Sequence, residues 1–366
     1  MSNTTFKLFS DLEKLMIDVE KRWQKQNFST ESFPDIVWEI TRNIDLSDLG
    51  EVSNQLQLFD IPSVRLLQKR STFSDLYTQI YHNGRFMIEI LNWWGGHVNV
   101  HDHDFSAVQF QLKGNALNVP YAFNTIENEG AIRFGDLKVA TAEIWKEGGR
   151  SIVRHGQDSL HGVFHLGEPT TSLLIRTIPT PRYGAQSNYF PSLAGHYYVS
   201  NDLLRKKMTA LSLLSKQNEK EFRYHLKKFL SSQSLSESFF MLLKLGEITF
   251  QEKYSDLMID YAQQGEKQSR VVENVIYNNG IDFFKSAVNN SLNLSQNEKI
   301  AAFAVASSCN LENFSKIEKC LEEHLPTSDL RSSLFRFINQ LEKDDQKTAD
   351  KYLDVFNLKG IIDEKI

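Results

Sequence analysis

The chain has 366 residues, of which 41% are hydrophobic and 24% are charged, a composition typical of a globular protein with two domains or one large domain. Its formal net charge of -5 provides no basic footprint for nucleic acid, and its two cysteines do not support a disulfide framework. Charged residues interrupt residues 1–18, which argues against a signal peptide or a membrane span there. We therefore expect a cytoplasmic protein with neither a nucleic-acid nor a membrane partner.

Residues 1–55 follow a helical pattern. Ser10 and Glu13 have the spacing of a capping box, and apolar residues recur with helical periodicity after them. A second short helix is predicted to begin at Pro34, since proline favours the first helical turn. A polar connector over residues 45–54 follows it. We expect this N-terminal segment to pack on the domain that comes next.

Residues 56–200 consist of short apolar runs that turn residues such as Asn83-Gly84 and Gly148-Gly149 separate. The predicted strands lie at residues 64–67, 86–91, 107–112, 118–123, 138–145, 151–154, 162–166 and 172–177. Many short strands at close spacing are typical of a sandwich or barrel. We therefore predict a β-barrel domain over this range.

Residues 201–366 return to a helical pattern with few glycines. Three pairs of residues with N-terminal capping spacing each precede an apolar helical run: Asn218 with Glu221, Ser234 with Glu237, and Ser295 with Glu298. We predict an all-helical C-terminal domain of about six to nine helices. No fixed repeat period indicates a solenoid.

Two histidines one residue apart are the strongest functional signal. His101 and His103 follow the glycine turn Gly95-Gly96 and precede an apolar strand. Residues i and i+2 of a strand point to the same face, so the two imidazoles would share one space, as in a metal site. A third ligand would come from a strand distant in sequence. The candidate segment, residues 154–165, contains His155, His161 and His165.

This ordered set of motifs resembles the cupin superfamily and, within it, thiol dioxygenases of the cysteine dioxygenase type. The residues that carry the resemblance are Phe86 to Trp93, His101-Asp102-His103, Leu112-Lys113-Gly114, Leu160-His161-Gly162-Val163, and Ser172 to Arg176 followed by Pro179. The likeness covers residues 60–185. The helical region after Asp202 lies outside it.

The resemblance implies a double-stranded β-helix (cupin, or jelly-roll) barrel. Together with the helical patterns before and after it, we expect an α+β chain with N-terminal helices, this barrel and a C-terminal all-helical domain. The resemblance also implies one Fe(II) ion bound by His101, His103 and His161. Three imidazoles leave coordination positions open for O2 and a substrate atom, and the net positive charge of such a site favours an anionic ligand. Imidazole ligands accept nickel, manganese and zinc as well.

The departures from the family concern the residues around the metal. Ala107 and Val108 stand where cupins have a glutamate and animal thiol dioxygenases a cysteine. Cysteine dioxygenases carry a Ser-x-His-x-Tyr motif. In this chain Leu174 stands in place of the His and Arg176 in place of the Tyr. Gln79 replaces the arginine that binds the amino acid carboxylate. The resemblance thus implies a substrate other than free cysteine.

Two further residues are candidates for catalysis. If Arg176 points into the barrel, its guanidinium would clamp a carboxylate or phosphate, whereas an outward arginine at a strand end is the other interpretation. His165 lies four residues after the last ligand, where cupins often have an asparagine that hydrogen-bonds inside the barrel, so we favour a supporting role over a fourth ligand. We interpret His155 as a turn residue.

Two functions from different classes remain. The first is a mononuclear non-haem Fe(II) oxygenase that uses O2 on a small-molecule substrate. The second is a metal-binding or ligand-binding cupin without redox chemistry, whose C-terminal helical domain is open to a protein contact or dimerisation. The complete set of three histidines favours the first function. The absence of the family's Tyr and Arg weakens the hypothesis that the substrate is a thiol.

Overall fold

The computed structural model describes residues 3–69, 74–94, 99–167, 169–180, 185–196, 201–290, 294–308 and 310–344. The chain forms two compact units. Unit 1 comprises residues 1–120, 141–186 and 320–326, and unit 2 comprises residues 121–140, 187–319 and 327–366. These units cross the predicted boundaries after residues 55 and 200, because the N-terminal helices share a unit with most of the strands, while residues 121–140 group with the C-terminal helices.

Four helices and a 3-10 turn open unit 1. They are α1 (Asn3–Gln24), α2 (Phe33–Ile40), the turn η1 (Ser47–Gly50), α3 (Val52–Leu58) and α4 (Pro62–Leu67). Helix α1 begins before Ser10, so the expected capping box lies inside the helix. The predicted polar connector is largely helical, and the strand predicted at residues 64–67 was wrong. Pro62 begins a helix there because its fixed φ suits the first helical turn.

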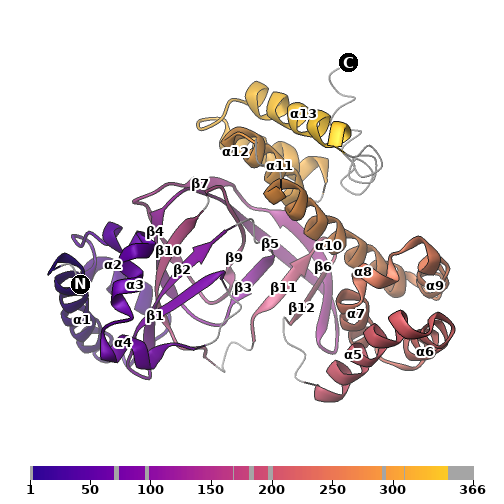
Figure 1. Ribbon diagram of the computed structural model, residues 1–366, viewed down its shortest axis with the longest axis horizontal. Coiled ribbons are helices and arrows are strands. Elements are labelled where there is room, and N and C mark those ends of the chain that lie inside the picture. Colours follow the sequence, from indigo (N-terminus) through magenta and orange to yellow (C-terminus); the bar gives the residue numbers. More distant parts are fainter. Residues whose placement is uncertain are drawn as a thin grey trace. The chain divides into compact units, whose positions relative to one another are not determined.

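A five-stranded antiparallel sheet in unit 1 has the order β1-β2-β10-β4-β8. Its strands are β1 (Leu76–His82), β2 (Phe86–Trp93), β4 (Ala107–Lys113), β8 (Arg150–Val153) and β10 (Thr170–Thr177). The N-terminal helices lie against one face of this sheet (Figure 1). Apolar residues from that face share a hydrophobic core with these helices; they include Phe86, Ile88, Ile90, Leu173 and Ile175. Because side chains alternate along a strand, Glu89, Leu91 and Trp93 point to the opposite face.

A second set of strands in unit 1 faces this sheet. It comprises β3 (Val100–His103), β9 (Gly156–His165), the first residues of β5 (Ala116–Glu129) and β7 (Glu143–Trp145). Trp93 of β2 stacks on His165 of β9 with 4.7 Å between ring centroids. The two sets of strands therefore share an interior, and the face of β2 that carries Glu89 lines it.

Unit 2 contains the remaining strands and the C-terminal helices. Its strands are the distal part of β5, β6 (Ile132–Val139), β11 (Ser187–Phe190) and β12 (Leu193–His196). Its helices are α5 (Asp202–Gln217), α6 (Glu219–Ser232), α7 (Leu235–Lys244), α8 (Gly246–Thr249), η3 (Glu252–Tyr254), α9 (Ser255–Ala262), α10 (Glu266–Asn290), α11 (Gln296–Ser308), α12 (Leu311–Leu321) and α13 (Thr327–Asp344). Strand residues such as Phe134 and Leu193 share one core with α5 to α10.

The helical prediction for the C-terminal region is confirmed over the part that the structure describes, since helices follow one another from Asp202 to Asp344; residues 345–366 lie outside the described residues. Ser234 and Glu237 form a reciprocal capping box, and hydrogen bonds join Ser295 and Glu298 in the same manner. Helices thus lie at both ends of the chain and strands in the middle. Among the described residues, no helix is both long and apolar enough to cross a bilayer.

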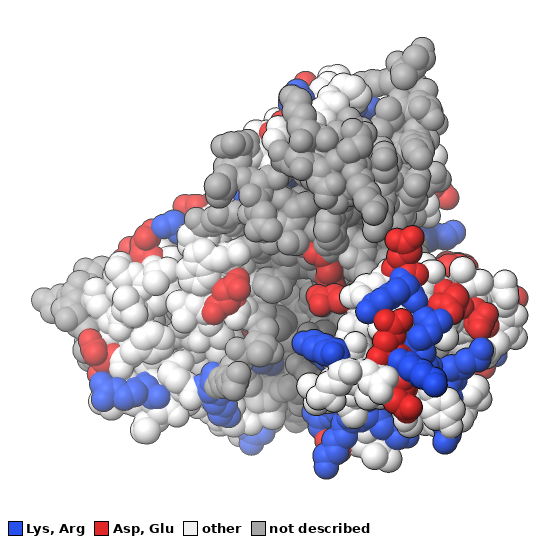
Figure 2. All heavy atoms as spheres, turned by 45° about the vertical axis from the view of Figure 1, so that its right-hand side comes forward, with Lys and Arg blue, Asp and Glu red and all other residues white. Residues whose placement is uncertain are grey.

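Charges of both signs are interspersed on the helices of unit 2 (Figure 2). Two of the ion pairs join α6 to α9: Arg223 with Asp256, and Lys227 with Asp260 at 3.1 Å. Mixed signs of this kind are typical of a solvated surface without a strong field of one sign.

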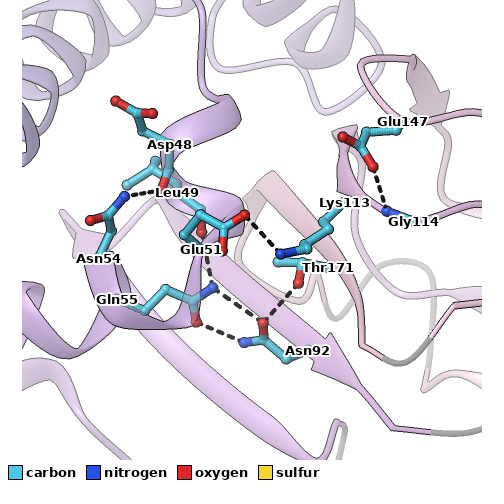
Figure 3. Close-up of polar contacts among 10 residues, drawn as sticks. All are labelled: Asp48, Leu49, Glu51, Asn54, Gln55, Asn92, Lys113, Gly114, Glu147 and Thr171. Atoms are coloured by element: carbon cyan, nitrogen blue, oxygen red, sulfur yellow. Dashed lines mark hydrogen bonds and ion pairs between the residues drawn. The ribbon is translucent and has the colours of Figure 1, made fainter.

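A buried polar network ties the N-terminal helices to the sheet (Figure 3). Gln55 of α3 and Asn92 of β2, both 0% exposed, exchange two amide hydrogen bonds of 2.7 and 3.1 Å. Thr171 of β10 donates to Asn92 at 2.9 Å, and Gln55 donates to the carbonyl oxygen of Leu49 at 2.9 Å. Because a buried polar group without a partner is costly, this network favours one placement of α3 on the sheet.

Replacing Asn92 with leucine should destabilise the protein, because it leaves Gln55 and Thr171 buried without their partner. The expected loss in the free energy of unfolding is about 1–3 kcal/mol for each buried group left unsatisfied. Lys113→Met is the control, since it removes only an exposed ion pair with Glu51, worth less than about 1 kcal/mol. Urea denaturation measures both, and equal losses would contradict the assigned role of the network.

Candidate metal centre

The structure brings together His101, His103 and His161, the three histidines that the sequence singles out. Their candidate ligand atoms all lie within 4.8 Å of one another, and the ring centroids are 4.8, 4.9 and 5.1 Å apart. All three belong to unit 1. The described residues contain no other group of three or more potential metal ligands among His, Cys, Asp and Glu.

Strand register produces this cluster. His101 of β3 lies directly opposite His161 of β9 in the antiparallel pair. The register then shifts, so that His103 lies opposite Gly156, a residue with a φ of 62°. Glycine tolerates this left-handed conformation at no steric cost. Such an irregularity re-aims side chains, and here the result is three imidazoles around one point.

Hydrogen bonds set the tautomers of two of these rings. His101 Nδ1 lies 2.8 Å from the carbonyl oxygen of Asn99, and His161 Nδ1 lies 2.8 Å from Asn118 Oδ1. Because both oxygens can only accept, each Nδ1 carries the proton, and each Nε2 keeps a lone pair for a metal. This arrangement is typical of metal-ligating histidines.

A carboxylate sets the orientation of the Asn118 amide. Asn118 Nδ2 donates to Glu143 Oε1 at 2.9 Å, which leaves Oδ1 to face His161. Trp145 Nε1 donates to the same carboxylate oxygen at 2.8 Å, and the Trp145 ring lies 5.8 Å from the His161 ring, centroid to centroid. A relay from Glu143 through Asn118 therefore positions His161.

The environment keeps the three imidazoles neutral. His103 and His161 are only 5% and 6% exposed. Burial, reinforced by the neighbouring imidazoles, holds the pKa of both well below the ordinary value of 6.5, and burial also lowers the pKa of His101. Neutral imidazole is the form that binds metals, so the cluster is prepared for an ion near neutral pH.

The guanidinium of Arg176 lies on the same side of the sheet as Glu89 and is already bound. Arg176 Nε donates to Glu89 Oε2 at 2.6 Å and Nη2 donates to Glu89 Oε1 at 2.9 Å. Tyr77 also donates to Glu89, and burial followed by the Glu89 charge raises the pKa of this phenol. The Arg176 guanidinium lies 4.5 Å from the centre of the Phe105 ring. Glu89 thus occupies the Nε–Nη2 edge of the guanidinium.

The other histidines of the segment lie outside the three-residue cluster. His165 is buried and stacks on Trp93, so it supports the interior wall. His155 Nδ1 lies 3.2 Å from the hydroxyl oxygen of Ser106. The turn residues Gly95 and Gly96 lie outside the described residues.

Sequence reasoning missed Asn118, Glu143, Tyr77 and Glu89. Glu89 had a signal, because it is the only charged residue within the otherwise apolar run from Phe86 to Leu91, and a charge is rarely buried without a partner. Asn118 and Glu143 had none, since only the pairing of β5 with β9 and β7 brings them beside His161.

Comparisons with known proteins give a limited result. No family model and no curated protein matches the chain. Solved structures match over part of it. An uncharacterised conserved protein with a double-stranded β-helix domain from Klebsiella pneumoniae is 16% identical, with a TM-score of 0.23, and the match covers 35% of this chain and 95% of that chain.

Two further structures match at a similar level. A cupin superfamily protein from Desulfitobacterium hafniense is 13% identical, with a TM-score of 0.20 and coverage of 32% of this chain and 89% of that chain. The capsular polysaccharide assembling protein CapF from Staphylococcus aureus is 12% identical, with a TM-score of 0.23 and coverage of 45% and 44%.

The metal-free protein should lose stability as the pH falls below about 6.5, the unperturbed histidine pKa. The folded-state pKa values of His103 and His161 lie below that value, so the unfolded chain binds protons first and acid favours unfolding. Each histidine contributes a slope of at most about 1.4 kcal/mol per pH unit. Urea unfolding across this range should show a smaller slope in His103→Gln than in the wild type. Equal slopes in the two proteins would contradict the buried, neutral state.

Proposed function

We propose that unit 1 is a double-stranded β-helix, or cupin, domain that binds one first-row divalent metal ion through His101, His103 and His161. One observation carries this proposal: three neutral imidazoles, two of them buried and that of His101 half-buried, lie together, and hydrogen bonds to Nδ1 leave Nε2 of His101 and His161 available. Two facing sets of antiparallel strands around a shared interior support the cupin assignment.

The donor set fits Fe(II), which we propose as the metal. Three neutral nitrogen ligands suit iron as well as zinc, nickel and manganese. They leave coordination positions open, and they do not cancel the charge of the ion. Second-sphere hydrogen bonds of the kind that Asn118 makes typically strengthen metal binding by 10–100-fold.

We further propose that the domain is a non-haem iron oxygenase that acts on a small molecule other than free cysteine. Bound iron would supply the ability to activate O2. The residues of the chain hold the imidazoles in place, and Leu91, Phe105 and Leu174 form part of a buried apolar cluster in the same unit. Glu89 occupies Arg176, and Gln79 and Leu174 replace residues with which the cysteine enzymes surround their substrate, so the interior offers no carboxylate clamp of that type.

A metal-binding cupin without redox chemistry is the second candidate. The observation that favours it is the commitment of the polar interior side chains to one another: Tyr77, Glu89 and Arg176 form a closed ion-paired network. In this alternative the C-terminal helices serve as a platform for a protein contact or for dimerisation.

Metal analysis of the purified protein should find about one ion per chain, because the three imidazoles provide enough ligands for one first-row ion. His103→Ala should lose the ion, and Asn118→Leu should bind it about 10–100-fold more weakly because His161 loses its positioning partner. His82→Ala is the matched control, since His82 lies outside the cluster at the end of β1. Full metal retention by His103→Ala would refute the site.

Oxygen uptake separates the two candidate functions. Protein loaded anaerobically with Fe(II) should consume O2 with at least one member of a panel of thiols, amines and amino acid derivatives, and His103→Ala should not. Uptake by neither protein, together with tight metal binding by the wild type, would favour the non-redox candidate over the oxygenase.

A further inference from the structure

The three candidate ligands differ in what orients their rings. In His101 and His161, Nδ1 donates to a carbonyl oxygen at 2.8 Å. Nδ1 of His103 is buried and has no hydrogen-bond partner among the described residues. Burial lowers the pKa of His103 and the Ser159 backbone offsets this only in part, so no strong hydrogen bond orients the ring. The orientation of His103 must therefore come from packing.

The ring of Phe105 packs against His103 from outside the histidine cluster. The two ring centroids are 5.1 Å apart and the planes are inclined by 67°, an edge-to-face contact of the kind that aromatic rings favour. Phe105 lies in the turn between β3 and β4 and is 6% exposed. It belongs to a buried apolar cluster with Leu91 and Leu174. Because buried side chains are closely packed, this ring limits the orientations that the imidazole can adopt.

The guanidinium of Arg176 in turn holds Phe105. Its central carbon lies 4.5 Å from the centroid of the Phe105 ring, within the range of about 6 Å for a cation–π contact. Glu89 fixes the guanidinium by accepting from Nε at 2.6 Å and from Nη2 at 2.9 Å. Two parallel hydrogen bonds determine the plane of a guanidinium as well as its position. Tyr77 donates to the same carboxylate and so restrains Glu89.

A continuous series of contacts therefore runs from the five-stranded sheet to a candidate ligand on β3. It begins at Tyr77 of β1 and passes through Glu89 of β2, Arg176 of β10 and Phe105 to His103. A buried ion pair contributes little net stability on its own, because removing both charges from water is costly. Its place beside Phe105 gives this pair a different role, which is to fix a ring that packs on the candidate metal centre.

We propose that Phe105 is a positioning residue for His103, and that the Arg176–Glu89 pair acts through Phe105 by fixing its ring. The ring contact does for His103 what the hydrogen bonds to Nδ1 do for the other two histidines. Its consequence for metal binding rests on the proposed function. The orientation of His103 itself needs no metal, so it can be tested separately.

The first test measures the mobility of the imidazole rings in the metal-free, full-length protein by carbon relaxation NMR. Phe105→Leu should make the His103 ring more mobile and leave His101 and His161 unchanged, because hydrogen bonds still orient those two rings. Phe110→Leu is the matched control, since Phe110 is also buried but packs with the N-terminal helices. A His103 ring that is as rigid in Phe105→Leu as in the wild type would overturn the proposal.

The second test is a titration of the same proteins with zinc against a competing chelator. Phe105→Leu should bind zinc about tenfold more weakly or worse, the usual effect of losing a group that orients a ligand. Phe110→Leu should bind as the wild type does, and Phe105→Tyr should restore the affinity because it keeps the ring. Wild-type affinity in Phe105→Leu would contradict the assignment. If the wild type binds no zinc, the proposed function fails, and the ring mobility still decides whether Phe105 positions His103.

A paired variant tests the role of the ion pair. Glu89→Gln combined with Arg176→Met removes both charges, so that neither is left buried alone. Because Phe105 loses its guanidinium, the His103 ring should be more mobile than in the wild type. This variant also tests the contact if Phe105→Leu fails to fold. An unchanged His103 ring would show that the pair does not act through Phe105.

Discussion

The antiparallel pairing of β3 with β9 places His101 directly opposite His161, and the candidate centre depends on that register. Side chains alternate along a strand, so a slip of one residue would turn either imidazole to the other face. The five-stranded sheet and the N-terminal helices packed on it hold the interior around this pair. The buried Gln55–Asn92–Thr171 network contributes by tying helix α3 to two strands of that sheet.

Electrostatics divides the interior of unit 1 into two parts with different chemistry. Around the histidines, burial keeps the imidazoles neutral. In His101 and His161, Nδ1 donates a hydrogen bond to a carbonyl oxygen, so Nε2 is the nitrogen that can bind a metal. Next to them, Arg176 and Glu89 compensate each other as a buried pair. Breaking such a pair by removing one partner is costly because a charge remains buried. Because Glu89 neutralises Arg176, a bound metal ion would be the group in this interior that attracts an anionic ligand.

Periodicity of two explains what could be predicted from the sequence. It predicted the shared face of His101 and His103 and the strands that became β2, β4 and β10. His161 could be included because it leads a strand, and the family resemblance supplied its role. Local patterns were insufficient at residues 64–67, where a short apolar run suits either a strand or a helix, and Pro62 decided for the helix. Contacts between distant strands, such as that of Asn118 with His161, have no local signature in the sequence. The boundary between the two compact units falls within the long strand β5, and the sequence composition does not change at that point.

The most direct test of the account is X-ray absorption of the zinc-loaded protein, because it reports the identity of the ligand atoms. The first shell should contain three imidazole nitrogens at about 2.0–2.1 Å, completed by light atoms from solvent, and His161→Ala should lose imidazole scattering. A first shell that lacks imidazole, or a spectrum that His161→Ala leaves unchanged, would contradict the claim that these three histidines form a metal centre.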